Sequence, residues 1–349
     1  MDLLTVGTRQ AKRYLEQSLK AGLVPFVQSS PGCGKSQIVA QIAEEQGLVM
    51  IDHRLSTSDI TDLNGLPRFI QGKDREIATF VPFDLFPIEG TPLPKGKNGW
   101  LLFLDEFNSA SEEVQAAAYK LVLDRAVGQH KLDPRVKIVC AGNLDTDKAI
   151  TRDLSTAMTS RLVKIKMEPV FDEWMTDVAL TRNFDPMLLA YMQMNQSDLL
   201  NFQPEKMEAD ASFSCPRTIE FLDKMLKSGM EINDSNVPLI SGIVGQGMAI
   251  KLNQFVKVKK SLITFEAIIK DPKGCPVPTE NSVKWVTLTT AMQRVDADNF
   301  ELLDDYIQRF NDISFTVLFY RSVTKNHQEI VKTKAFVKRV ASVAKYIFD

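Results

Sequence analysis

The sequence predicts an α/β fold in which helices cover both faces of a parallel sheet, followed by a helical region. Five short apolar runs of strand length alternate with amphipathic helical patterns in the first half of the chain. Two of these runs, LLFLD and VKIVCAG, are apolar almost throughout, which is typical of strands covered on both faces. Beyond residue 167 the strand pattern fades and helical periodicity continues.

Composition and charge restrict the classes of protein that fit. The 349 residues are 44% hydrophobic and 25% charged, which is typical of globular proteins, and the length indicates two or three domains. The net charge of -2 provides no overall basic field for nucleic acid. Because no apolar run could span a membrane and the N-terminus lacks a secretory signal pattern, we expect a cytoplasmic protein whose four separated cysteines stay reduced.

Periodicity places the elements in order along the chain. The expected strands are 22–28, 48–52, 100–105, 136–141 and 162–167, with helices at 36–46 and 111–127. Prolines and glycines interleave between residues 65 and 99, which indicates an insertion outside the sheet. Further helices are expected at 171–184, 186–195, 216–227 and 240–258. From residue 259 the pattern is mixed, with helices and a strand or two in SLITFEAII.

A phosphate-binding loop is the most specific motif. The first expected strand leads into SSPGCGKS, residues 29–36, which matches G-x-x-x-x-G-K-S/T except that Ser29 replaces the first glycine. Glycines let backbone N–H groups turn toward a phosphate, and the following helix N-terminus adds partial positive charge. We expect Lys35 to contact the outer phosphates and Ser36 to ligate Mg²⁺. The residues expected to hold the nucleotide in this loop are Ser30, Pro31, Gly32, Cys33, Gly34, Lys35 and Ser36.

Two adjacent carboxylates end the strand LLFLD. Asp105 and Glu106 lie at its carboxyl end, where ligands of open α/β sheets bind. Asp105 fits a water-mediated position on Mg²⁺, and Glu106 fits the role of orienting and activating the water that attacks the γ-phosphate. The alternative is a pair of solvated carboxylates at the start of a helix, a position that the helix dipole also favours.

An asparagine and two arginines complete the candidate site. Strand VKIVCAG brings Asn143 to the same sheet edge, where its carboxamide can bind a water at the γ-phosphate, although asparagine after a strand is also a common turn former. Phosphoryl transfer needs positive charge in the transition state, which Arg161 or Arg217 could supply. Spacing alone does not separate these from Arg125 or Arg152, and each also fits a solvated surface charge.

Together these motifs resemble the AAA+ ATPases, and among them the MoxR family. SPGCGKS is similar to the AAA+ Walker A loop, LLFLDEFNSA to the MoxR Walker B segment, and AGN to sensor 1. LSTAMTSR resembles the helix that carries the arginine finger, CPRT resembles sensor 2, and SDITDLNG resembles the segment that leads into an insertion in helix 2. The resemblance covers roughly residues 1–230. It departs from the family pattern at two positions: Ser29 replaces a glycine, and Ser109 replaces a residue that is commonly arginine.

The resemblance implies a fold and a set of partners. It implies an AAA+ core with a parallel five-stranded sheet of order 5-1-4-3-2 in residues 1–168 and an α-helical lid in residues 169–258. Residues 259–349 form a mixed extension of unknown role, for which the family offers no counterpart. The implied protein hydrolyses ATP with Mg²⁺ and forms a ring, usually a hexamer, with ATP between neighbouring subunits.

The resemblance also implies a role for each site residue. Lys35, Ser36, Asp105 and Glu106 become the nucleotide and hydrolysis residues, and Asn143 becomes sensor 1. Arg217 becomes sensor 2 on the lid, and Arg161 acts in the site of the neighbouring subunit.

Three functions remain open at this point. MoxR-like enzymes typically act as chaperones or remodellers of proteins, often with a partner that carries a von Willebrand factor A domain, and we expect this class. One alternative is an AAA+ motor or loader acting on nucleic acid, which the near-zero net charge disfavours. The other is a nucleotide-gated scaffold, in which hydrolysis serves only as a timer.

Two further segments have two interpretations each. FVPFDLFPIEG, residues 80–90, fits either an exposed partner-binding loop or packing on its own domain. Residues 321–349 hold seven Lys or Arg against two acids, a local charge of +5, which fits an acidic partner or a solvated helix face. The three histidines are scattered and predict no metal site.

Overall fold

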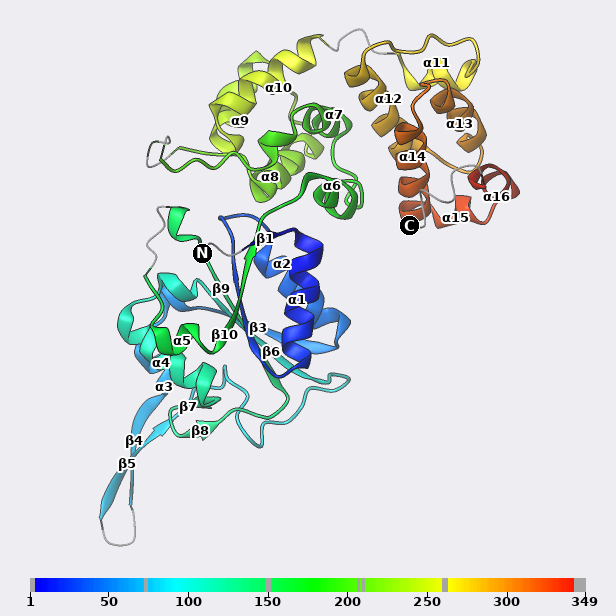
Figure 1. Cartoon of the computed structure of the whole chain (residues 1–349). Coiled ribbons are helices and arrows are strands. Elements are labelled where there is room, and N and C mark those ends of the chain that lie inside the picture. Colours follow the sequence, from blue (N-terminus) through cyan, green and yellow to red (C-terminus); the bar gives the residue numbers. More distant parts are fainter. Residues whose placement is uncertain are drawn as a thin grey trace. The chain divides into compact units, whose positions relative to one another are not determined.

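The computed structural model describes residues 4–71, 75–147, 152–205, 208, 211–258 and 263–341. The chain divides into two units, one of Met1–Val170 with Gln203–Glu208 and one of Phe171–Phe202 with Ala209–Asp349. The first unit is built on a parallel sheet and the second on helices (Figure 1). Within the described ranges no helix combines the length and the apolar character that crossing a membrane requires.

A six-stranded parallel sheet lies at the centre of the first unit, in the order β1-β10-β2-β9-β6-β3. Numbered by the five expected strands, this order is 5-1-4-3-2, so the predicted topology is confirmed. A short strand that we did not predict, β1, pairs with β10 at one edge. The strands are β1 Thr5–Val6, β2 Val24–Gln28, β3 Leu48–Arg54, β6 Gly99–Asp105, β9 Val136–Gly142 and β10 Leu162–Met167.

Helices cover both faces of this sheet. Figure 1 shows α1 and α2 on one face and α4 on the other. The bounds of these helices are α1 Thr8–Lys20, α2 Lys35–Glu45 and α4 Glu112–Leu123. Val114 and Leu121 of α4 share a buried cluster with Leu102 and Leu104 of β6, and β6 is buried at every position. This cover explains why LLFLD is apolar without alternation.

The helix that begins the segment 111–127 is shorter than periodicity predicted. It ends at Leu123, because Arg125 adopts a left-handed φ of 51° that no helix continues through. The next residues form strand β7, Ala126–Val127, which pairs with β8, His130–Lys131. The helical expectation for residues 124–127 was therefore wrong.

The segment 65–99 contains a hairpin outside the main sheet. Strands β4, Leu66–Gln71, and β5, Glu76–Val81, pair antiparallel and project from the first unit (Figure 1). Its exposed large apolar side chains are Leu66, Phe69, Ile70, Ile77, Phe80 and Val81. FVPFDLFPIEG combines both of its expected behaviours, because Phe86 is buried in the core while Phe83 stays exposed.

Short helical turns complete the first unit. Several of them follow the strands whose carboxyl ends carry the candidate site residues. They are η1 Leu55–Thr57, α3 Ile60–Asn64, η2 Phe107–Ser109, η3 Asp145–Asp147 and α5 Thr156–Thr159.

The second unit is helical in all its described parts, and one buried cluster runs through it from Trp174 to Phe336. The segments 169–258 and 259–349 therefore share one core. The bounds are α6 Phe171–Trp174, a π-helical turn Met175–Ala179, α7 Pro186–Met194, η5 Gln196–Leu199, α8 Pro216–Lys227, η6 Asp234–Asn236, α9 Val237–Val244, α10 Gln246–Val258, α11 Phe265–Lys270, α12 Asn281–Arg294, α13 Phe300–Gln308, α14 Ile313–Asn326, α15 Gln328–Val331 and α16 Lys334–Val340.

A glycine divides the helix expected over 240–258. Gly245 separates α9 from α10 with a φ of +86°. A Cβ at this position would lie 2.6 Å from the carbonyl oxygen of Ser212, so a neighbouring segment occupies the space of a side chain. Only glycine tolerates both the backbone angle and the close approach.

The mixed character expected for the C-terminal extension is corrected, since no strand occurs in the described range 263–341. The strand expected in SLITFEAII is helix α11 from Phe265, and residues 261–262 lie outside the described part. The Thr264 hydroxyl caps this helix by accepting from the N–H of Ala267 at 3.3 Å, and Ile268 is buried in the unit core. A cap and a packed face outweigh the β-branched residues that favour a strand.

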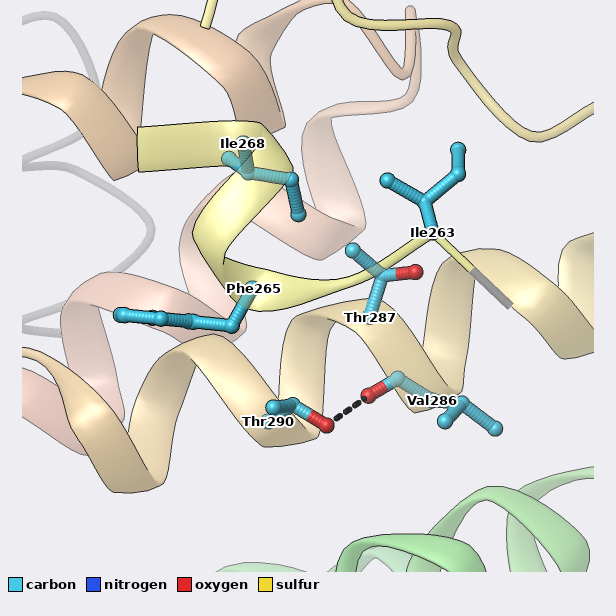
Figure 2. A pocket seen from close by; sticks show the side chains of 6 residues that line it. All are labelled: Ile263, Phe265, Ile268, Val286, Thr287 and Thr290. Atoms are coloured by element: carbon cyan, nitrogen blue, oxygen red, sulfur yellow. Dashed lines mark hydrogen bonds between the residues drawn. The ribbon is translucent and has the colours of Figure 1, made fainter. Parts of the chain in front are cut away.

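A small pocket lies beside α11 and α12 in the second unit. Figure 2 shows its six lining side chains, Ile263, Phe265, Ile268, Val286, Thr287 and Thr290. The Thr290 hydroxyl donates to the Val286 carbonyl at 2.8 Å, and Thr287 likewise donates within its own helix, so the lining is effectively apolar. Its volume of about 40 Å³ is far below the ~300–1,000 Å³ of ligand pockets.

Candidate active site

Three neighbouring strands bring the candidate residues to one edge of the sheet. Gln28, the last residue of β2, lies opposite Gly142 of β9, and Cys140 of β9 lies opposite Leu104 of β6. The carboxyl ends of β2, β9 and β6 therefore meet side by side. The loop after β2, the acidic pair after β6 and the asparagine after β9 start from these three ends, as the sequence predicted.

The loop of residues 29–36 has the backbone that a phosphate cradle needs. Gly32 and Gly34 have φ angles of 77° and 92°, where side chains are strained, and Gly34 directly precedes α2. Ser29 does not have a positive φ, so the backbone there does not require the glycine of the motif. Its N–H donates to the Gly142 carbonyl at 3.4 Å, which links the loop to β9.

The ammonium group of Lys35 lies inside this loop. Its Nζ donates to the Ser29 carbonyl at 2.8 Å, to the Ser29 hydroxyl at 3.2 Å and to Oδ1 of Asn143 at 3.4 Å. The structure thus brings together two residues that lie 108 positions apart and that the sequence assigned to one site. A lysine ammonium group held against a glycine-rich loop adds positive charge to the place where the loop would bind an anion.

The carboxylates after β6 lie in a strongly negative region. Burial raises the pKa of Asp52 on the adjacent strand β3, and the negative charges of Asp105 and Glu106 raise it further, while Arg54 and His53 act in the opposite direction. The Asp105 side chain is 9% exposed, and its Oδ1 accepts the N–H of Glu106 at 2.8 Å. Sequence reasoning did not single out Asp52, although it is the last residue of the strand expected at 48–52.

The donor set at this edge suits a hard divalent cation. Ser36 and Asp105 carry the oxygen atoms expected to ligate it, and the negative charge of Asp105 adds to burial in raising the pKa of Asp52. No cluster of three or more His, Cys, Asp or Glu side chains among the described residues forms a metal cage. A site of few protein oxygens, completed by phosphate and water, is typical of Mg²⁺.

Glu106 has an unusual backbone conformation. Its φ of 55° and ψ of 34° place it in the left-handed region, which costs about 1–3 kcal/mol for a residue with a side chain. The turn directs its carboxylate toward η1, where the Ser56 hydroxyl donates to Oε2. Strain held at a single carboxylate beside a phosphate loop is a feature of functional sites.

Asn108 is a site residue that sequence reasoning did not identify. Its Nδ2 donates to the Asn143 carbonyl at 2.8 Å, and its Oδ1 accepts the Asn143 N–H at 3.1 Å. A Cβ on Gly142 would lie 2.3 Å from that Oδ1, so a glycine makes room for the clamp. Asn108 is 2% exposed, and its two hydrogen bonds fix the backbone of Asn143 relative to the turn that follows Glu106. In the sequence, each asparagine only follows a strand motif, DEFN or AGN, and nothing there indicates that the two are bonded.

The four candidate arginines have different surroundings. Arg125 is partly buried and donates to the Val136 carbonyl, and burial lowers its pKa, so its role is structural. Arg152 pairs with Glu112 at 3.6 Å. Arg161 is exposed, and its Nη1 donates to the Ala157 carbonyl of its own short helix at 2.8 Å.

Arg217 belongs to the second unit. It is the second residue of α8 and is exposed. Helix α8 begins as the sequence predicted, with Pro216 at its first position and the Thr218 hydroxyl accepting the Cys215 N–H at 2.9 Å. The structure therefore presents Arg217 at a rigid, capped helix start.

Comparison with solved structures finds many distant matches. No family model and no curated protein matches the sequence. A "putative ATPase" of Cytophaga hutchinsonii is 15% identical, with a TM-score of 0.36 over 97% of this chain and 81% of the other. RuvB of Thermotoga maritima, a Holliday junction branch migration motor, is 17% identical, with a TM-score of 0.35 over 87% of this chain and 88% of the other. Similarity at this level supports no further conclusion. The strand order and the loop backbone of the chain itself show an α/β P-loop fold of the AAA+ type.

Proposed function

We propose that this protein is a Mg²⁺-dependent ATP hydrolase of AAA+ type that works as a ring and remodels a protein partner. The observation that supports the proposal is the contact of Lys35 with Asn143, which joins the loop after β2 to the residue expected as sensor 1, at the sheet edge where the acidic pair after β6 also begins. The glycine backbone of the loop and its helix N-terminus add the anion-binding geometry.

Each side chain at the edge has a task in phosphoanhydride hydrolysis. Backbone N–H groups of the loop bind the β- and γ-phosphates, and Lys35 exchanges its present carbonyl and amide partners for phosphate oxygens. Ser36 and, through water, Asp105 would hold Mg²⁺, which would supply positive charge to the phosphates. Glu106 accepts a proton from the attacking water as the new bond to the γ-phosphorus forms and the bond to the β-phosphate oxygen breaks.

The transition state of phosphoryl transfer needs positive charge beyond that of Lys35. Arg161 is exposed and bonded to its own helix, so it is available to a neighbouring copy. We assign it as the arginine that completes the site of the next subunit in a ring, usually of six, and Arg217 as a cation carried by the second unit. Hydrolysis then depends on assembly.

The β4–β5 hairpin supports a protein partner over nucleic acid. Phe69 is 68% exposed, and the apolar residues of both strands face solvent on a projecting ribbon. A two-stranded ribbon with apolar side chains on both faces gains stability by contacting protein. We propose that this hairpin contacts the partner, for which a protein with a von Willebrand factor A domain is one candidate.

Nucleotide binding is the first test. Lys35→Ala should weaken MgATP binding by at least about a hundredfold, because it removes the cation nearest the phosphates. Lys20→Ala, an exposed lysine at the end of α1, is the matched control and should bind as wild type. Titration calorimetry measures both. Equal binding by Lys35→Ala and Lys20→Ala would contradict the proposal.

A mixing experiment tests the shared site. Arg161→Ala rings and Glu106→Gln rings should each be inactive, and mixed rings should regain part of the turnover at interfaces that combine intact Glu106 with intact Arg161. No recovery in rings shown by mass to be mixed would exclude Arg161 as the shared cation.

Two measurements separate the alternatives. Stimulation of ATP turnover by DNA, with a steep loss at higher salt, would favour a nucleic acid motor. Full biological activity of Glu106→Gln trapped with ATP would favour a scaffold. A remodeller should show neither result, and it should hold its protein partner tightly in the trapped state.

A further inference from the structure

A buried carboxylate outside every motif described above contacts the phosphate-binding loop. We propose that Asp147 is a positioning residue that holds this loop in its binding conformation through the Ser30 hydroxyl. The inference deepens the proposed function and rests on it. Asp147 ends the turn η3 after Asn143 and lies 117 positions from Ser30 along the chain.

Both oxygens of Asp147 have assigned partners. Oδ1 accepts from the Ser30 hydroxyl at 3.1 Å, and Oδ2 accepts from the Leu144 N–H at 3.2 Å. The Asp147 N–H in turn donates to the Leu144 carbonyl at 3.0 Å. One carboxylate therefore ties the P-loop after β2 to the turn after β9.

Burying the Asp147 carboxylate costs desolvation free energy, which its hydrogen bonds must offset. Asp147 is 7% exposed and Ser30 is also 7% exposed, so the bond between them is shielded from water. Burial raises the pKa of Asp147, whereas the Ser30 hydroxyl, the Leu144 N–H and the positive charges of Lys35 and Lys166 lower it. Hydrogen bonds to a charged acceptor are among the stronger ones in proteins.

The bond acts directly before the glycines of the loop. Ser30 is followed by Pro31 and Gly32, and Gly32 has a left-handed φ of 77°. Because glycine has more backbone freedom than other residues, a fixed point at Ser30 lowers the entropy lost when the N–H groups of the loop gather around a phosphate. Asp147 would thus act on binding and leave the hydrolytic step to Glu106.

The turn bond and the loop bond can be separated by mutation. Ser30→Ala removes the loop bond and leaves the Asp147–Leu144 bond in place. Asp147→Asn has the same shape but no charge. If its one oxygen keeps the Leu144 N–H, the bond from the Ser30 hydroxyl to Oδ1 is lost, and only a weaker, uncharged contact from Nδ2 to Ser30 Oγ can replace it. Ser30→Thr keeps a hydroxyl at position 30, and Thr146→Ala, an exposed neighbour on the same turn, is the matched control.

The test is MgATP affinity by titration calorimetry, with every variant in a Glu106→Gln background that prevents turnover. We expect Ser30→Ala and Asp147→Asn each to weaken binding roughly tenfold, which equals about 1.4 kcal/mol. The double variant should be no more than about threefold weaker than either single one, because both remove the same bond. Ser30→Thr should recover most of the affinity, and Thr146→Ala should bind like the parent.

Steady-state kinetics with Glu106 intact provide a second readout. A positioning role predicts a raised KM for ATP, with kcat within about threefold of wild type. Wild-type affinity in Ser30→Ala would overturn the inference even if Asp147→Asn failed to fold. Additive effects of the two substitutions would also overturn it. Absence of nucleotide binding by the wild-type protein would instead overturn the proposed function on which the inference rests.

Discussion

Buried polar side chains occur in both units, but their partners differ. At the sheet edge of the first unit they bind backbone groups and hydroxyls of loops, as Asn108 binds Asn143 and Asp147 binds Ser30. In the second unit buried carboxylates bind cations on helices. The pairs are Asp198 with Lys251 at 3.1 Å, Asp223 with Lys227 at 2.7 Å and Asp304 with Arg339 at 2.7 Å.

The difference separates two uses of a costly buried group. A carboxylate paired with a cation on another helix, as Asp304 of α13 is with Arg339 of α16, stabilises one packing arrangement, and breaking the pair leaves an uncompensated charge in the core. A polar group that holds a loop contributes to the geometry of a site, where small displacements reduce the rate. Changes in the first unit should therefore reduce activity, and changes in the second should reduce stability.

Glu106→Gln should have the largest effect, and it should change activity rather than stability. We expect turnover to fall about 10²–10⁴-fold, because the amide cannot accept the proton of the attacking water. The melting temperature should stay near that of wild type. Glu113→Gln, an exposed glutamate in the first turn of α4, is the control for ATPase assays. Near-normal turnover in Glu106→Gln would exclude Glu106 as the base.

Arg339→Met tests whether a buried ion pair of the second unit contributes to stability. The fully buried Asp304 would lose its cation, and removing one partner of a buried pair costs about 3 kcal/mol. For a unit of this size we expect the melting temperature to fall roughly 6–12 °C. Lys338→Met, the exposed neighbour on α16, should change little. A stable Arg339→Met protein would show that the buried pair does not hold α16 to α13.

Asn108→Ala sharpens the comparison, because it removes a buried polar residue that acts on a loop. We expect turnover to fall about tenfold as Asn143 loses its clamp, since misplacement of a catalytic group costs rate. Its melting temperature should fall less than that of Arg339→Met. Ser109→Ala is the matched neighbour for calorimetry and ATPase assays. A fall in stability equal to that of Arg339→Met, without loss of turnover, would break the distinction.

Ser56→Ala should give the smallest change. Its hydroxyl donates to the Glu106 carboxylate, so its removal frees that carboxylate to bind the attacking water. We expect basal turnover to rise about two- to fivefold, which corresponds to a net hydrogen bond of about 1 kcal/mol. Thr57→Val on the same turn is the control. A decrease in turnover would show that Ser56 supports Glu106 in its working position.

Much of the first unit could be predicted from local patterns. The five apolar runs became five strands within a few residues of their expected limits, because strands buried on both faces must be apolar throughout. The spacing SSPGCGKS predicted the loop, because left-handed positions select glycine, and the helix expected from Ser36 begins one residue earlier, at Lys35. The order of the strands followed from a family resemblance, which the pairing of β2 between β10 and β9 confirmed.

The ends of helices and strands were harder to predict where contacts with residues far along the chain determine them. The helix before Arg125 ends early because the chain turns back to pair β7 with β8, and α11 forms where a strand was expected because its apolar face joins the helical core. Propensity describes one residue in isolation, whereas these outcomes depend on packing partners.

The sequence by itself determined which residues are candidates for the site, because Lys35, Asp105, Glu106 and Asn143 stand at recognisable distances from strands and glycines. Only the tertiary structure decided which residues hold them in place. Ser56 meets Glu106 across 50 positions, Asn108 meets Asn143 across 35, and Ser30 meets Asp147 across 117. Hydrogen bonds between loops at the ends of different strands are selected when the sheet assembles, and no local pattern in the chain encodes them.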